Sequence, residues 1–142
     1  MEDYLRQVQR DGLALQSVPD ELKTEQLCLA AVQQDGRALE FVPDELKTEQ
    51  LCLIALQQDG LALRFIPNEL KTEQLCLAAV QQDGWALTFV PDELKTSKEF
   101  LRDCYRVNNT CLKYILAKFR EFAIQPTGVR TKVAIREENI FE

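Results

Sequence analysis

The chain has 142 residues, 46% of them apolar and 28% charged, which is enough apolar material for a packed core and argues against disorder. Residues 1–96 contain 17 acids and 8 bases (net −9), and residues 97–142 contain 6 acids and 9 bases (net +3). An acidic array repels phosphate backbones, and the longest apolar run, six residues, is far too short to span a membrane. We therefore expect no nucleic-acid or membrane partner.

The first residues, MEDYLRQVQRDG, are polar and carry acids, unlike a secretory signal. This favours a cytoplasmic protein, with export by a route that needs no such signal left open. The chain also lacks histidine, the commonest general base and metal ligand.

A period of 24 residues runs through the first two thirds of the chain. The segment Leu22–Gly36 recurs letter for letter at Leu70–Gly84 and almost unchanged at Leu46–Gly60. A fixed period of this length indicates a solenoid-type array. We predict an N-terminal capping unit (1–24), repeats at 25–48, 49–72 and 73–96, a helical cap at 97–125 and an extended tail at 126–142.

Each unit is predicted to hold two helical pieces and one further turn. Thr24 is a plausible N-cap for a helix that continues to about Asp35, and Gly36 is expected to end it in the left-handed conformation. A second, short helix follows and ends before Pro43, which in turn begins one more helical turn.

The run LCLAAV within each unit is apolar on every side, which a helix requires when it is sandwiched between two neighbours. A buried strand is the competing interpretation, but the Thr and Gly boundaries and the alanine pairs favour a helix. In the flanking units, polar residues replace the apolar positions Leu27, Ala30 and Ala31, as capping units require. These replacements are Asp3, Arg6 and Gln7 at one end and Glu99, Arg102 and Asp103 at the other.

After the array, Thr96–Glu99 resembles a capping box and predicts a helix to about Val107. A turn at Asn108-Asn109 and an amphipathic helix over Thr110–Ala123 follow. The predicted fold is an all-α, short, right-handed-type α-solenoid of about four 24-residue helix-turn-helix repeats with a two-helix C-terminal cap. The tail is expected to pack along the terminal helices, to be partly disordered, or to dock on a partner.

The repeated frame Gly-x-Ala-Leu, Pro-x-x-Leu-Lys and Leu-x-Ala resembles a 24-residue helical repeat family of bacteria and protists that is catalogued only as a domain of unknown function. The resemblance covers about residues 3–96. It implies a helical array and supplies no activity and no catalytic residue.

Cysteines and paired acids are the side chains that most resemble reactive groups. Cys28, Cys52 and Cys76 form one column of the repeat, and helices about 8–10 Å apart do not bring such a column within disulfide reach. We predict a line of buried thiols. Cys104 and Cys111 lie on either side of the Asn-Asn turn and are able to approach each other, but we expect reduced thiols. The paired acids at 20/21, 44/45 and 92/93 are predicted to be solvated first-turn residues.

Near-identical units differ most clearly in two columns three residues apart on the short second helix, and we call these columns the variable face. The first column holds Leu13, Arg37, Leu61 and Trp85, and the second holds Gln16, Glu40, Arg64 and Thr88. A buried column does not accept Leu, Arg and Trp in turn, so this face is predicted to be exposed and to bind a protein. The alternative is that these positions vary because nothing constrains them.

We therefore expect a non-enzymatic protein-interaction module with no cofactor and no metal, because no nucleophile–base pair, phosphate loop or metal cluster is recognisable. The expected binding residues are Leu13, Arg37, Leu61, Trp85, Glu40, Arg64 and Thr88. The alternative function is an inhibitor or secreted bacterial effector that blocks a partner enzyme through the C-terminal segment. The identity of the protein partner and self-association both stay open.

Overall fold

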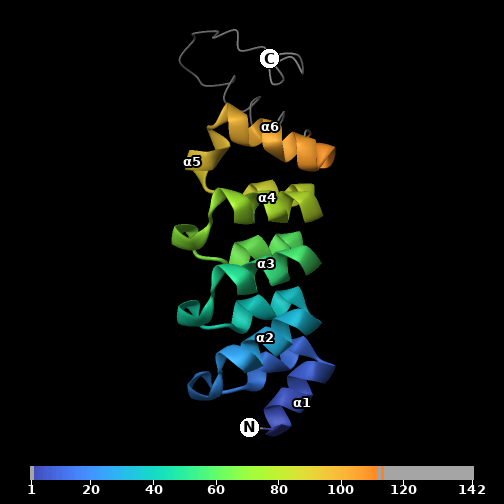
Figure 1. Cartoon of the computed structure of the whole chain (residues 1–142), viewed down its shortest axis with the longest axis vertical. Helices are drawn as coiled ribbons and strands as arrows, with labels where there is room; N and C mark the ends of the chain where they lie inside the picture. The colour runs from blue at the N-terminus through green and yellow to red at the C-terminus, as the bar shows by residue number, and fades with distance from the viewer. Residues whose placement is uncertain (1, 112, 114–142) are drawn as a thin grey trace, which may run out of the picture.

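The computed structural model describes residues 2–111 and 113, and every regular element in that part of the chain is helical. The α-helices are α1 (Glu2–Arg10), α2 (Glu25–Gln34), α3 (Glu49–Gln58), α4 (Glu73–Gln82), α5 (Asp92–Lys95) and α6 (Lys98–Val107). The 3₁₀ helices are η1 (Gly12–Ser17), η2 (Asp20–Leu22), η3 (Gly36–Phe41), η4 (Asp44–Leu46), η5 (Gly60–Phe65), η6 (Asn68–Leu70), η7 (Gly84–Phe89) and η8 (Asn109–Cys111). The predicted all-α repeat fold is confirmed, and Figure 1 shows the units stacked along one axis.

A side-chain cap starts the long helix of each repeat. Thr24 is extended, and its Oγ1 accepts a hydrogen bond from the backbone N–H of Leu27 at 3.2 Å. This bond satisfies one of the amide groups that a helix start leaves unpaired, and Glu25 places a negative charge in the first turn, where the helix dipole favours it. Thr48 and Thr72 cap α3 and α4 in the same way, so the predicted N-caps are confirmed.

One aspartate both ends the long helix and starts the 3₁₀ helix that follows. The N–H of Asp35 still donates to the carbonyl of Ala31, but its backbone is extended (φ −149°, ψ 117°). Its carboxylate then accepts a hydrogen bond from the N–H of Arg37 at 2.9 Å. The predicted second helix is therefore η3, a 3₁₀ helix of six residues, where runs of three or four are usual.

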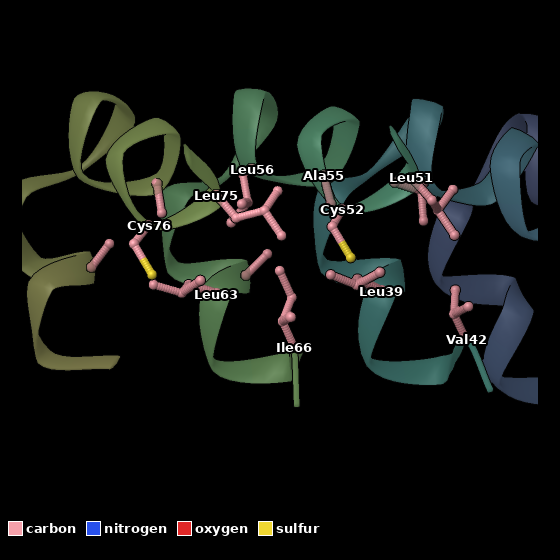
Figure 2. Packing of buried hydrophobic residues seen from close by; sticks show 14 of the residues in the cluster. Leu39, Val42, Leu51, Cys52, Ala55, Leu56, Leu63, Ile66, Leu75 and Cys76 are labelled. Atoms are coloured by element: carbon pink, nitrogen blue, oxygen red, sulfur yellow. The ribbon is translucent and has the colours of Figure 1, made fainter. Parts of the chain in front are cut away.

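The core lies between a layer of α-helices and a layer of six-residue 3₁₀ helices. The long α-helices pack in succession, α1 to α4 in order and then α4 against α6. The helices η1, η3, η5 and η7 pack against one another in turn, and the two layers contact each other within and between units. Figure 2 shows Cys52 and Leu51 of α3 pointing toward the layer that holds Leu39 and Leu63. Four residues of the LCLAAV run are buried (Leu27, Cys28, Ala31 and Val32), and Leu29 and Ala30 are half-buried.

The glycine that follows each long helix has a role that the sequence did not predict. None of Gly12, Gly36, Gly60 and Gly84 has a φ in the left-handed region, so the expectation of a left-handed helix end is wrong. A Cβ added to Gly36 would lie 2.6 Å from the carbonyl oxygen of Ala55 in the following repeat. The glycine is therefore required because two units approach each other closely at this point.

The C-terminal cap repeats the same architecture with an offset of one residue. Ser97 is the N-cap of α6, because its Oγ accepts from the N–H of Phe100 at 3.3 Å. The predicted capping box at Thr96 is therefore one residue early, and the Thr96 hydroxyl instead donates to the carbonyl of Glu93. Asn108 ends α6 and accepts from the N–H of Thr110, as Asp83 accepts from Trp85.

The first unit of the array is polar where the middle is apolar, as predicted, but the C-terminal cap is not. Asp3, Arg6 and Gln7 of α1 are exposed, and Val8 packs into the core. The predicted polar replacements at Glu99, Arg102 and Asp103 are one residue out of register, because α6 follows α4 at an offset of 25 residues. The counterparts of Leu75 and Ala79 are Phe100 and Cys104, and both are buried. The predicted helix Thr110–Ala123 and the tail at 126–142 lie, apart from residues 110, 111 and 113, outside the described part of the chain.

Candidate functional site

The variable face lies on the outer side of the stacked 3₁₀ helices. Residues three apart eclipse each other in a 3₁₀ helix, so the two variable columns point the same way. All four residues of the second column are exposed: Gln16, Glu40, Arg64 and Thr88. In the first column Arg37 and Trp85 are exposed, whereas Leu13 and Leu61 are half-buried. The face is therefore accessible along its length, as the sequence predicts, but binding itself stays a prediction.

Arg37 is held in place by the aspartate that caps its own helix. Its Nε lies 3.2 Å from Oδ1 of Asp35, and its Nη2 lies 2.8 Å from Oδ2. The Arg37 guanidinium lowers the pKa of the Asp35 carboxyl, and the carboxylate raises the pKa of Arg37. This two-point contact orients the guanidinium at the surface before any ligand arrives.

Trp85 has 69% of its surface exposed and is the most exposed large apolar side chain in the described chain. It is also the only tryptophan of the sequence. In the neighbouring unit, the Arg64 guanidinium carbon lies 4.5 Å from the centre of the Phe65 ring, a cation–π contact. The face thus presents aromatic, cationic and anionic groups over three successive units.

Sequence reasoning missed the contact that joins one repeat to the next. Lys23, Lys47 and Lys71 each donate a hydrogen bond from Nζ to a backbone carbonyl 18 residues further on, at 2.7–2.8 Å. The acceptors are the carbonyls of Phe41, Phe65 and Phe89, which lie near the ends of the following 3₁₀ helices. The signal was present in the sequence, because a lysine occurs at this place in every unit.

One of these lysines lacks the carboxylate that its counterparts have. Asp20 and Asp44 lie 2.7 and 2.8 Å from the Nζ atoms of Lys23 and Lys47. In the third unit Asn68 stands at the aspartate position, and burial of Lys71 lowers the pKa of its ammonium. The exchange of Asp for Asn therefore removes one ion pair and leaves the hydrogen bond to Phe89 in place.

We expect Asn68→Asp to raise the pKa of Lys71 and to stabilise the protein by about 0.5 kcal/mol, because in the equivalent pairs the carboxylate is exposed and water screens it, although the lysine is covered. The pKa is measured by an NMR titration of the lysine side chain, and the stability by thermal unfolding at low and high salt. Asp44→Asn is the matched control, because it should remove a similar increment of stability from an equivalent ion pair. A stability change that is equal at both salt concentrations would contradict the ion-pair explanation.

The five cysteines are buried and free, which confirms the predicted line of thiols in one column of the repeat. Burial raises the pKa of Cys52, Cys76 and Cys111 to about 11, and it raises the pKa of Cys28 and Cys104 as well. A thiol that stays protonated and covered is a weak nucleophile. Within residues 2–111 and 113, no group of three or more acids and cysteines is placed to hold a metal ion.

The paired acids have the surroundings that the sequence predicts. Asp20 with Glu21, Asp44 with Glu45, and Asp92 with Glu93 are all exposed at the starts of short helical turns. Their first members pair with the lysines at distances of 2.7–4.0 Å. These carboxylates therefore stabilise the array at its edge.

The chain belongs to the family described as Domain of unknown function (DUF4116). The family model matches residues 8–47, 24–71 and 72–120, so the resemblance inferred from the repeated frame is confirmed. No curated protein and no solved structure matches the chain. Among the described helices, none is both long and apolar enough to cross a membrane.

The last of these matches extends past residue 96, where the sequence period ends. The structure gives a physical reason, because α6 and η8 follow α4 and η7 at an offset of 25 residues instead of 24. The turn α5 (Asp92–Lys95) is α-helical where η2, η4 and η6 are 3₁₀, and it accommodates the extra residue. A search for an unbroken 24-residue period does not recognise a unit that is shifted in this way.

Proposed function

We propose that the protein is a non-enzymatic protein-interaction module that binds its partner through the variable face. The observation that carries the proposal is the exposure of Trp85 in a column whose other members are Leu13, Arg37 and Leu61. The capping residues, the core residues and the lysine contacts recur almost unchanged from unit to unit. The sequence differences between units are therefore concentrated at positions where they leave the fold intact. Exposed Trp and Arg side chains are the types that dominate binding energy in protein interfaces.

A rigid array supports this use of the face. Side-chain caps start its long helices, and the lysine-to-carbonyl bonds join successive units, so the columns on the 3₁₀ helices keep a fixed spacing. A surface that is ordered before binding loses less conformational entropy when the partner docks. The buried thiols and the solvated acids offer no competing site of chemistry in the described chain.

We expect the double variant Trp85→Ala, Arg37→Ala to lose a partner that the intact chain retains from native lysate. Both side chains are exposed, so the unfolding temperature should fall by no more than about 2 °C. The retained proteins are identified by mass spectrometry, and folding is checked by circular dichroism. The matched control is Gln33→Ala, Gln57→Ala, two exposed positions on the α-helical layer.

Retention of the same partner by both chains would overturn the assignment of the face. Retention of no protein by the intact chain would also count against a binding function. A loss of stability well above 2 °C in the double variant would instead give Trp85 a structural role.

A further inference from the structure

We infer that the occupant of the variable face is a second copy of this chain, bound face to face in the antiparallel direction. This inference rests on the proposed function, since it names the partner of the same surface. It is argued from the order of the side chains along the two columns, because reversing that order brings together complementary side chains in three of the four pairs.

Symmetry fixes which residues would meet. The two-fold axis lies in the plane of the face and is perpendicular to the long axis of the array. It places each column of one copy opposite the same column of the other copy, which runs in the reverse direction. When all four units overlap, the axis passes between the second and third units. Leu13 then meets Trp85 of the second copy, and Arg37 meets Leu61. In the other column, Glu40 meets Arg64 and Gln16 meets Thr88. Each pair occurs twice.

Three of the four pairs are chemically matched, and the fourth, Arg37 with Leu61, places a charged side chain against an apolar one. The Trp85 ring, 69% exposed in one copy, is covered by the half-buried Leu13 of the other. Glu40 and Arg64 are the acid and the base of their column, and they are brought together in both halves of the dimer. Gln16 and Thr88 are both polar and exposed. Figure 1 shows the units stacked along one axis, so their short helices follow one another along the array.

Charge distinguishes this register from the two alternatives that keep three units in contact. With the axis through the third unit, Arg64 meets Arg64 of the second copy. With the axis through the second unit, Glu40 meets Glu40. Like charges placed opposite each other weaken an interface. In the full overlap, every charged residue of this column meets a residue of opposite charge.

The capping aspartates at the edge of the face oppose this arrangement, because it places like charges opposite each other. In the full overlap Asp35 faces Asp59 of the second copy, and Asp11 faces Asp83. Arg37 offsets the first of these contacts, because its guanidinium binds Asp35 and stands opposite the unit that carries Asp59. The second contact lies at the ends of the overlap, where solvent screens it.

The test is the oligomeric state of the intact chain by sedimentation velocity over a wide range of concentration, at low and moderate salt. We expect a reversible dimer. Glu40→Arg and Arg64→Glu should each weaken it about tenfold or more, because each replaces two attractive pairs by two repulsive ones. The combined variant Glu40→Arg, Arg64→Glu restores both pairs in reverse and should recover the dimer to within a few-fold.

A matched control is Glu45→Arg, which reverses an exposed charge on η4, away from the face, and should leave the dimer unchanged. A monomer at all concentrations overturns the inference, as does a dimer that neither single reversal weakens. Failure of the combined variant to recover the dimer, with its circular dichroism spectrum intact, overturns the pairing of Glu40 with Arg64. If the chain is monomeric but retains a different protein, and the Trp85→Ala, Arg37→Ala variant loses that protein, the proposed function stands. Only the second copy is then excluded as the partner.

Discussion

Replacement of Gly36 by alanine should destabilise the protein by about 3 kcal/mol, although the backbone conformation at this position suits any residue. The new Cβ would lie 2.6 Å from the carbonyl oxygen of Ala55 and 3.3 Å from the Cβ of Gln58. The carbonyl belongs to the backbone of α3, so no side-chain rotation relieves the overlap. The second and third units would have to separate, and the core between them would loosen.

The sign of this effect is informative because the opposite sign is the usual one. Where φ is negative and space is available, Gly→Ala stabilises a protein by about 0.4–1 kcal/mol, since it restricts the unfolded chain. The overlap with Ala55 is expected to outweigh that gain. Urea unfolding followed by circular dichroism measures the difference. Gln33→Ala, at an exposed position of α2 outside the variable face, should change the stability by less than about 0.5 kcal/mol. A stabilised Gly36→Ala variant would show that the units do not approach as described.

The fold was largely predictable because one period carried several independent signals. The threonine caps, the apolar run LCLAAV and the proline before each turn each indicate a local structure, and repetition lets every unit test the interpretation of the others. Capping residues act within three or four positions along the chain, which is why their hydrogen bonds follow from sequence alone.

The features that escaped prediction depend on contacts between units. Gly36 looked like a left-handed helix end because glycine favours that conformation, but its neighbour is a carbonyl 19 residues further on. The Nζ of Lys47 donates to the carbonyl of Phe65, which is 18 residues further on and which no local pattern indicates. Over six positions, a 3₁₀ helix and an α-helix require the same pattern of apolar residues. The sequence therefore did not decide which of the two helix types the second helix adopts.

The variable face was predictable as an exposed surface but not as a site. Comparison of units within one chain shows where variation is tolerated, and the exposure of Arg37 and Trp85 agrees with that. The bidentate contact between Arg37 and Asp35 requires the turn geometry of the cap, which places the two side chains together at a separation of two residues.

The second large effect is a steep loss of stability in alkaline solution, between about pH 9 and pH 11. Burial raises the pKa of Cys52, Cys76 and Cys111 from an ordinary value of 9.0 to about 11, so the folded chain holds these protons more tightly than the unfolded chain does. Groups of this kind contribute stability that is fully present below pH 9 and is lost as the pH rises through the folded pKa.

The size of the loss follows from the number of thiols. Above pH 9, each thiol that is ionised only in the unfolded state removes about 1.4 kcal/mol of stability per pH unit. Three such groups remove several kcal/mol by pH 11, which is comparable with the total stability of a small domain. The lowered pKa of Lys71 acts in the opposite direction, because its deprotonation relieves a buried charge, but it is one group against five cysteines.

We expect the urea midpoint of the intact chain, measured in reducing buffer, to be constant between pH 7 and 8.5 and to fall steeply from pH 9 to 10.5. The variant Cys28→Ala, Cys52→Ala, Cys76→Ala should start from a lower midpoint, because each substitution leaves a small cavity, but should fall more slowly with pH. Its remaining slope comes from Cys104 and Cys111, whose pKa burial also raises and which both chains share. Parallel curves for the two chains would show that the pKa of these three thiols is the same in the folded and unfolded chains. The origin of alkaline unfolding would then lie elsewhere in the array.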